Sequence, residues 1–525
     1  MSSDPLGDVR LPPSPDQVEH GLRRALDEED WSSAVQLLGT HWSLLLDEHR
    51  ELLDLALKAV PLGAFEQDAR AAAVRDIRLH SSADAVDRML GAATLPDADD
   101  TAKLESLARS ERALSLLSVA SSRMIALRVR GRMSRAIQLA RLVEMFGRIA
   151  AVHQPALVHD RLPPALLQAG ITRGLADDLP GAAVGLRDAY ERAHQSRVAY
   201  VERDAAGKSA LFHALEGDIE QARSWLERHD DAPTADGWYR SRIALTADVA
   251  RSLVAIEGLR SSEAQAAVRL LDQPVNAEQS WGPTVSYARM RYALAWGDRL
   301  SALDSLRSDR VRYAEWLGEG TTMGPLLAQG EVDLLLSLGQ TRQARLVIDA
   351  QDDHLVNRVA RAQLALVEGD VVGAARRAAA TLGERQTIRA RVKALTVHAV
   401  ATDRRPGGMS AAESYSDLRA AIGERGLLFA ALSVPADVRG PLDALLPPDH
   451  GARQVLPDPT DRVRLTPQQQ HVLLGLERGL TVREIALESH LSTNTVKSHA
   501  RALYRRLEST TRDQVIGRAY ELGLL

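Results

Sequence analysis

The clearest hydrophobic pattern lies in residues 465–525, where apolar and polar positions predict four short amphipathic helices. Three of the predicted helix starts carry a capping box, in the pairs Thr466 and Gln469, Thr481 and Glu484, and Thr511 and Gln514. In each pair two side chains satisfy backbone N–H groups that the helix cannot bond itself. Gly479 is placed to end the first helix and Gly523 the fourth.

The third predicted helix has two chemically different faces. It begins after Ser492, a capping residue, and runs from about Thr493 to Leu507. Its apolar stripe consists of Val496, Ala500, Leu503 and Leu507. Its opposite face consists of Asn494, Lys497, Ser498, Arg501 and Arg505. A helix of about 22 Å with this division can be anchored by one side while the other lies in the major groove of DNA.

The residue types on the polar face suit base edges and phosphates. Lysine and arginine pair with guanine O6 and N7, and asparagine pairs with adenine. The chain has only five lysines, and Lys497 is the only one after residue 464. Residues 465–525 carry eight Lys and Arg against six Asp and Glu, so this part is net +2 in a chain of net charge −5. A solvated basic face without a partner is the alternative interpretation of this helix.

A weak repeat runs through residues 1–445. It consists of a glycine turn between Ala/Leu-rich helical stretches, with an alanine five residues after the glycine. The clear copies are Gly131/Ala136, Gly217/Ala222, Gly297/Ala302, Gly339/Ala344 and Gly369/Ala374, with weaker ones at Asp30/Ala34, Asp177/Ala182 and Gly258/Ala264. From residue 181 onward neighbouring copies lie about 30 to 42 residues apart, the length of a two-helix repeat. The pattern predicts a helical solenoid similar to a tetratricopeptide array, with a binding surface on its concave face; an irregular helical bundle is the alternative.

Size and composition narrow the function classes. The 525 residues exceed one ordinary core, and the 4% aromatic content favours Ala/Leu helices over β-structure. The absence of cysteine excludes disulfides and thiolate metal sites. No stretch approaches 18 apolar residues, so we expect a cytoplasmic protein that does not enter the membrane. We find no nucleophile and base pair and predict no enzyme, no cofactor and no metal site.

The terminal motifs resemble the helix-turn-helix domain of LuxR/FixJ/NarL-type bacterial transcription regulators. The residues that carry the resemblance are Leu465–Gln468, Gly479, Thr481, Glu484–Ala486, Leu491, Ser492, Thr495–Lys497, His499 and Glu521–Leu524. Gln470 departs from the family, which usually has an acidic residue there. The resemblance implies that Lys497, Ser498 and Arg501 approach bases and that Thr495 touches phosphate. It also implies that Val515, Ile516, Ala519 and Tyr520 of the fourth helix pair with a second copy.

Residues 426–446 are similar to the end of the repeat region in the large maltose-regulator type of these activators, which usually carry an ATPase module. The only phosphate-loop candidate here is Gly207-Lys208-Ser209, and Glu202 occupies the position where such a loop needs its first glycine. A carboxylate at that position would repel phosphates. We therefore interpret the segment as part of a helix and expect no ATPase.

Together these patterns predict an all-α protein with three parts. Residues 1–446 form a helical-repeat domain that senses a signal or binds a partner, residues 447–464 form a linker, and residues 465–525 bind DNA. We expect a sequence-specific regulator that binds double-stranded DNA as a homodimer, with an effector or protein partner at the repeats and RNA polymerase as a candidate partner. The alternative is an interaction scaffold whose terminal domain reads no DNA.

Overall fold

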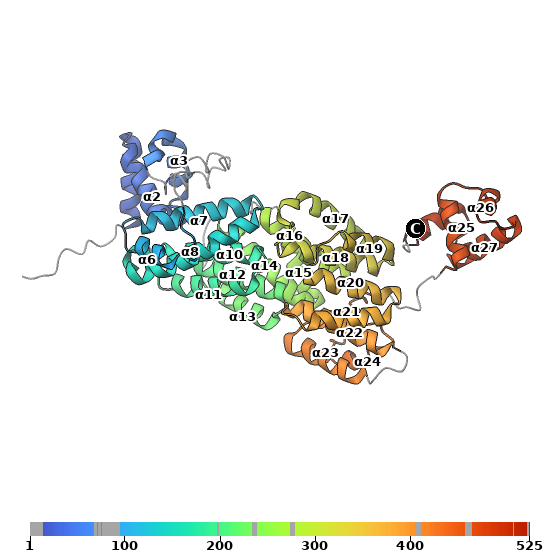
Figure 1. Cartoon of the computed structure of the whole chain (residues 1–525). Helices are drawn as coiled ribbons and strands as arrows, with labels where there is room; N and C mark the ends of the chain where they lie inside the picture. The colour runs from blue at the N-terminus through green and yellow to red at the C-terminus, as the bar shows by residue number, and fades with distance from the viewer. Residues whose placement is uncertain are drawn as a thin grey trace, which may run out of the picture. The chain divides into compact units, whose positions relative to one another are not determined.

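The computed structural model describes residues 14–67, 71, 75, 95–196, 199–233, 239–272, 279–405, 411–456, 465–507, 509–521 and 524–525. Every regular element within these residues is a helix, which confirms the predicted all-α class (Figure 1). Up to residue 196 the elements are α1 (Pro15–Asp27), α2 (Trp31–Glu48), α3 (Arg50–Ala59), η1 (Leu62–Gln67), α6 (Thr101–Ala108), α7 (Ala113–Val129), α8 (Met133–His153), α9 (Pro155–Val158), α10 (Leu162–Leu175) and α11 (Leu179–Ala193).

Residues 199–312 form α12 (Ala199–Glu216), α13 (Ile219–Asp231), α14 (Tyr239–Glu257), α15 (Ser261–Leu270), η2 (Gln279–Trp281), α16 (Gly282–Ala295) and α17 (Arg299–Arg312). Residues 314–443 form η3 (Ala314–Trp316), α18 (Met323–Ser337), α19 (Thr341–Asp349), α20 (Leu355–Glu368), α21 (Val371–Leu382), α22 (Ile388–Asp403), α23 (Ala411–Arg425), η4 (Leu428–Ser433) and α24 (Gly440–Asp443). The last elements are α25 (Pro467–Glu477), α26 (Val482–Glu488), α27 (Thr493–Arg506) and α28 (Arg512–Glu521).

One type of turn joins the helices of successive pairs. A residue in the left-handed conformation ends the first helix, at Glu29, Gly131, Asp177, Gly217, Leu259, Gly339 and Gly369. The amide of the following residue then donates to the carbonyl four residues before the turn residue, as Asp370 does to Ala365 at 3.0 Å. The alanine five residues after each turn residue is fully buried, at positions 34, 136, 182, 222, 264, 344 and 374.

These turns confirm the predicted glycine-and-alanine signature and refine it. In the weaker copies the left-handed residue is Asp177, as predicted, but Glu29 in place of Asp30 and Leu259 in place of Gly258. The copy at Gly297 departs from the others, because Gly297 is not left-handed and Ala302 is only half-buried. The small side chain at the alanine position allows two helix backbones to approach closely, which a larger residue would prevent.

Backbone contacts divide the chain into two units, Met1–Ser209 with Arg228–Ile243, and Ala210–Glu227 with Ala244–Leu525. In the second unit α16, α18, α20 and α22 contact one another in that order, and α17, α19 and α21 each pack between consecutive members of the row (Figure 1). Contacts between consecutive repeats are typical of a helical-repeat array. In the first unit α10 packs against α7, α8 and α11.

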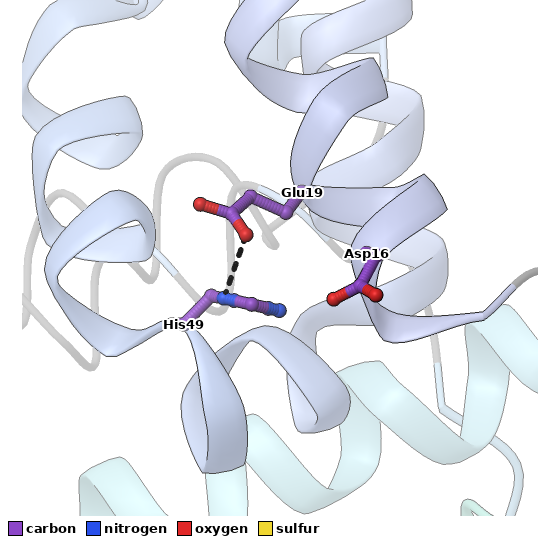
Figure 2. A group of neighbouring side chains, drawn as sticks. All are labelled: Asp16, Glu19 and His49. Atoms are coloured by element: carbon purple, nitrogen blue, oxygen red, sulfur yellow. Dashed lines mark ion pairs between the residues drawn. The ribbon is translucent and has the colours of Figure 1, made fainter.

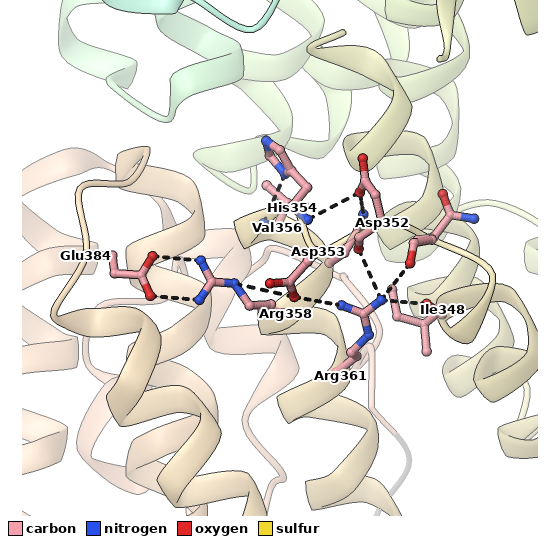
Figure 3. Close-up of polar contacts among 10 residues, drawn as sticks. Ile348, Asp352, Asp353, His354, Val356, Arg358, Arg361 and Glu384 are labelled. Carbon is pink, nitrogen blue, oxygen red and sulfur yellow. Dashed lines mark hydrogen bonds and ion pairs between the residues drawn. The ribbon is translucent and has the colours of Figure 1, made fainter. Parts of the chain in front are cut away.

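Polar contacts tie one repeat to the next around α20. Arg361 donates to the backbone carbonyls of Ile348, Gln351 and Asp352, at 2.8–3.2 Å, and so binds the end of α19 (Figure 3). Arg358 forms two hydrogen bonds of 2.7 Å with Glu384, which follows α21. His354 Nδ1 accepts from the Val356 amide and caps α20. Exposed pairs contribute little individually, but together these contacts fix the register of three helices.

A buried ionic group links distant parts of the second unit. Glu257 of α14 is 1% exposed and pairs with Arg291 of α16 and with Arg389 of α22. Arg389 also donates to the carbonyls of Ala214 and Leu215 at the end of α12. Burial alone would raise the pKa of Glu257, but the two guanidinium groups outweigh it and hold the pKa below the ordinary value. The carboxylate therefore remains charged and joins α14, α16 and α22.

The segment that contains the phosphate-loop candidate is helical. Residues 203–209 lie inside α12, and Lys208 forms an ion pair with Asp204 one turn earlier. The interpretation of Gly207-Lys208-Ser209 as part of a helix is thus confirmed. The backbone amides of this segment belong to the helix and do not form the open loop that cradles phosphates.

Part of the predicted linker belongs to the second unit instead. Residues 450–456, here called the anchor segment, have no helical turns but are bound by backbone hydrogen bonds. The Arg453 amide donates to Ala295 at 2.9 Å, and the Val455 amide donates to Leu432 at 2.8 Å. Val455 is 1% exposed and Leu456 is 4% exposed. The prediction that the linker covers all of 447–464 therefore fails over this part, because two apolar side chains are buried there; residues 457–464 lie outside the described residues.

Side chains of the α16–α17 turn hold the same segment. Trp296 Nε1 donates to the His450 carbonyl at 2.8 Å, and Arg299 donates to the Gln454 carbonyl at 2.6 Å. Arg453 in turn donates to the Gly297 carbonyl. The α16–α17 turn, where the copy at Gly297 departs from the repeat signature, is thus the turn that binds the anchor segment.

The buried alanines can be tested with a matched pair of substitutions. We expect Ala344→Leu to destabilise the protein by about 1–3 kcal/mol, because the added atoms overpack a fully buried helix contact. Ala302→Leu, at the half-buried equivalent position, should cost clearly less. Thermal and urea unfolding of both variants measure the difference. Equal losses would show that the alanine position is not a close helix contact.

The anchor segment can be tested by proteolysis. Val455→Asp places an unpaired carboxylate in a buried site, which costs several kcal/mol, so the segment should detach. Trypsin should then cleave after Arg453 at least about tenfold faster, since about 1.4 kcal/mol corresponds to a factor of ten. Mass spectrometry of the fragment that begins at Gln454 gives the rate. The control is Val372→Asp, at a residue that is 58% exposed; unchanged cleavage in Val455→Asp would contradict the anchoring.

Candidate nucleic-acid interface

The last four helices form a small core of their own. Its fully or nearly fully buried residues are Val472, Leu473, Leu476, Ile485, Ala486, Val496, Leu503, Leu507, Val515, Ala519 and Leu525. Helix α27 packs against α25 and α26, and α28 packs against α25. Gly475 makes the α25–α26 approach possible, because a Cβ there would lie 2.6 Å from Ile485 Cγ1. No local pattern around Gly475 indicates this role.

The helix starts agree with the sequence predictions. Thr466 and Thr481 form capping boxes with Gln469 and Glu484. The third box is also present, since the Gln514 amide donates to Thr511 Oγ1 and the Thr511 amide donates to Gln514 Oε1, both at 3.2 Å. Gly479 is left-handed after α25, as predicted, whereas Gly523 lies outside the described residues.

Helix α27 is held by one face and exposed on the other. Val496, Leu503 and Leu507 are at most 2% exposed, and Ala500 is partly buried against the same core. On the opposite face the exposed residues are Asn494, Lys497, Ser498, Arg501 and Arg505. The helix has 14 residues and is therefore about 21 Å long. The structure thus brings the predicted polar residues onto one surface of one helix.

The start of α27 is fixed by local contacts. Ser492 Oγ accepts from the Thr495 amide at 3.1 Å, and the two hydroxyl oxygens lie 2.8 Å apart. Thr495 is half-buried, so its position beside the cap is well defined. His490 adopts a left-handed conformation in the turn before the helix, and the Leu491 amide donates to the Ala486 carbonyl at 3.0 Å. This turn sets the angle at which α27 leaves α26.

The charges on the exposed face are not neutralised within the described part of the domain. Lys497, Arg501 and Arg505 form no ion pair there, whereas Arg478 and Glu488 pair with each other between α25 and α26. Hydrogen bonds from Thr481 lower the pKa of Glu484, so this carboxylate is committed to capping α26. The cationic face of α27 can therefore interact with an external anion without first breaking an ion pair to any described residue.

The predicted pairing residues of α28 divide into two sets. Val515 and Ala519 are fully buried in the domain's own core, so they cannot form a surface for a second copy. This corrects their predicted assignment, and the physical reason is the helical period, which places both residues on the face toward α25. Ile516 is partly buried and Tyr520 is 45% exposed. Tyr520 donates to Glu477 Oε1 at 2.9 Å, which connects α28 to α25.

Two further contacts explain residues that sequence analysis left unassigned. Gln470 donates its side-chain amide to the Leu524 carbonyl at 2.8 Å. An ionised acidic residue could not donate this bond, so the departure from the family pattern has a structural role here. Arg512 donates to the Leu476 carbonyl at the end of α25. Both contacts join residues far apart in sequence, and no local pattern reveals them.

A separate group of side chains near the start of the chain offers atoms of the types that bind metals. Asp16 and Glu19 of α1 and His49, between α2 and α3, bring ligand atoms within 4.8 Å of one another (Figure 2). Glu19 already pairs with His49 Nδ1 at 3.4 Å and with Arg23 at 2.8 Å. We assign this group the structural role of linking α1 to the start of α3.

Comparison with known proteins places only the terminal region in a family. Residues 463–519 match the family described as bacterial regulatory proteins, luxR family. No curated protein matches the chain. Among the described residues no helix is long and apolar enough to cross a membrane. The match covers the capped helix starts, the exposed basic face and the core apart from Leu525, and residues 463–519 are therefore a DNA-binding helix-turn-helix domain of the luxR family of bacterial regulatory proteins.

Proposed function

We propose that the protein is a sequence-specific bacterial transcription regulator whose helical repeats receive a signal. The observation that carries this proposal is the exposed face of α27, where Lys497, Arg501 and Arg505 stand opposite the buried stripe. Lys497 and Arg501, one turn apart, are spaced to contact neighbouring base pairs or phosphates in the major groove. Asn494 and Ser498 supply further donors and acceptors on the same surface.

A homodimer would supply the second reading helix. Two copies of α27 one turn of DNA apart would bind a two-fold symmetric site. With Val515 and Ala519 committed to the core, the α28 surface for this contact is centred on Ile516 and Tyr520. Pairing through such a small surface is weak by itself, so a bound operator would stabilise it.

The anchor segment offers a route from the repeats to the DNA-binding domain. It is bound to the α16–α17 turn and to Leu432, and the chain continues from it toward α25. A ligand or partner that favours the bound or the detached state of this segment would shift the populations of the two states. The proposed regulation therefore acts by changing how freely the DNA-binding domains move, and it needs no chemical reaction.

Binding to selected DNA tests base reading by α27. We expect Arg501→Ala to weaken binding of full-length protein to its preferred site by about 1–3 kcal/mol and to relax the sequence preference. Arg506→Ala is a matched control, because it removes the same charge from the same helix at about 140° around the axis from Arg501. The site is obtained by selecting sheared genomic fragments with the wild-type protein. Equal losses in both variants would indicate general attraction to phosphates and not base reading.

The same selection separates a regulator from an interaction scaffold. A regulator should enrich a few fragments that share a two-fold sequence, and a Lys497→Ala/Arg501→Ala double variant should lose them. Equal recovery by wild type and double variant would reject the proposed function. If the full chain enriches no DNA, the same assay with residues 460–525 alone shows whether the repeats suppress DNA binding.

A further inference from the structure

The hairpin formed by α7 and α8 is unusually basic. Residues 113–153 contain seven arginines and one acidic residue, Glu144, in a chain whose net charge is −5. Glu144 is 4% exposed and pairs with Arg173 of α10, and Arg173 also pairs with Asp178. The single carboxylate of the hairpin is therefore engaged with another helix. Most of the positive charge of the hairpin has no acidic counterpart within the hairpin.

Four of these arginines line one pocket. Arg123 of α7, Arg130 beside the turn, Arg132 at the start of α8 and Arg135 of α8 line an open pocket of about 420 Å³. The residues come from facing sides of two antiparallel helices, since 123, 127 and 130 share one face of α7, and 132, 135 and 139 share one face of α8. None of the described residues that line the pocket is acidic. Within the described residues, Arg130, Arg132 and Arg135 form no ion pair.

The pocket also has an apolar wall and a rigid frame. Leu95, Leu127 and Leu139 line it between the arginines. Next to it, Arg128 is 2% exposed and donates to the Gln168 carbonyl and to Thr172 Oγ1 of α10, both at 3.2 Å. Gly131 is left-handed in the turn, which fixes the ends of the two helices relative to each other. The helix ends that carry the pocket are therefore fixed before any ligand arrives.

We propose that this pocket binds a small anion that carries a diphosphate group. Guanidinium groups bind phosphate oxygens in a planar, two-pronged geometry, and two adjacent phosphates present enough oxygens and charge for several arginines. The volume suits a metabolite, and the leucine side chains provide contact for an attached organic group such as a nucleoside. The concave shape and the limited volume favour a small anion over the extended phosphate row of a DNA duplex. The role of this anion as the regulator's signal rests on the function proposed above, whereas its binding does not.

Calorimetry with inorganic pyrophosphate and with ADP tests the site on the full-length protein at low ionic strength. We expect both probes to bind, and the Arg132→Gln/Arg135→Gln variant to lose at least about tenfold in affinity, because each charge-assisted bond contributes a factor of about ten or more. Both arginines are exposed, so this variant should keep the thermal stability of the wild type. Arg132→Lys/Arg135→Lys, which keeps the charge but not the planar geometry, should fall between the two.

A charge-matched control removes two exposed arginines elsewhere. Arg342→Gln/Arg376→Gln, on α19 and α21, should bind both probes like the wild type. Absence of binding by the wild type, or equal loss in both glutamine pairs, would overturn the proposal. If the wild type binds neither pyrophosphate nor ADP, while Arg132→Gln/Arg135→Gln lowers the general affinity for DNA, the arginines bind nucleic acid. That result would also overturn the proposal.

DNA selection with and without the bound probe distinguishes this inference from the proposed function. The Lys497→Ala/Arg501→Ala variant should bind the diphosphate normally and lose the selected DNA. Selective DNA binding without diphosphate binding would reject the pocket alone. Diphosphate binding without any selective DNA binding would reject the regulator and leave the pocket established. If adding the probe leaves the DNA affinity unchanged, the pocket binds the diphosphate but does not regulate DNA binding.

Discussion

The close approach of two helices across a left-handed turn is the constraint on which the repeat region depends. The turn residue allows the last carbonyls of one helix to accept hydrogen bonds while the chain reverses. The buried alanine five residues later has a side chain too small to separate the two helices. Gly479 and His490 in the DNA-binding domain provide the same reversal. The turn therefore recurs in both parts of the chain, although the two parts serve different purposes.

Buried charge gives the second unit contacts that repetition alone does not provide. Neighbouring helices in a repeat array contact only the next pair, whereas Arg389 reaches both Glu257 and the end of α12. Arg291 adds a contact to Phe429, with its guanidinium carbon 3.6 Å from the ring centroid. Removing one member of such a group leaves an uncompensated charge in the interior. The group thus makes α12, α14, α16 and α22 interdependent.

The parts of the structure that depend on local chemistry could be predicted from the sequence. The capping boxes, the stripe of α27 and the glycine turns are each determined within a few residues, and the structure confirms them. The left-handed turns at Glu29 and Leu259 could not be predicted, because these residue types give no signal for that conformation. The anchor segment was also missed. Its polar and proline-rich composition is that of a linker, while its backbone bonds go to residues about 20 to 160 positions earlier in the sequence.

The anchor segment also limits how far a DNA-binding domain can move. Leu456 is buried against the second unit, and only eight residues separate it from Leu465 at the start of the domain. Eight residues span at most about 29 Å even when fully extended. The reach of the DNA-binding domain from the anchor segment is thus fixed by this length, and each residue released from the anchor would extend it by about 3.6 Å. The half-site spacings that a dimer could reach would then depend on how much of the anchor segment is bound.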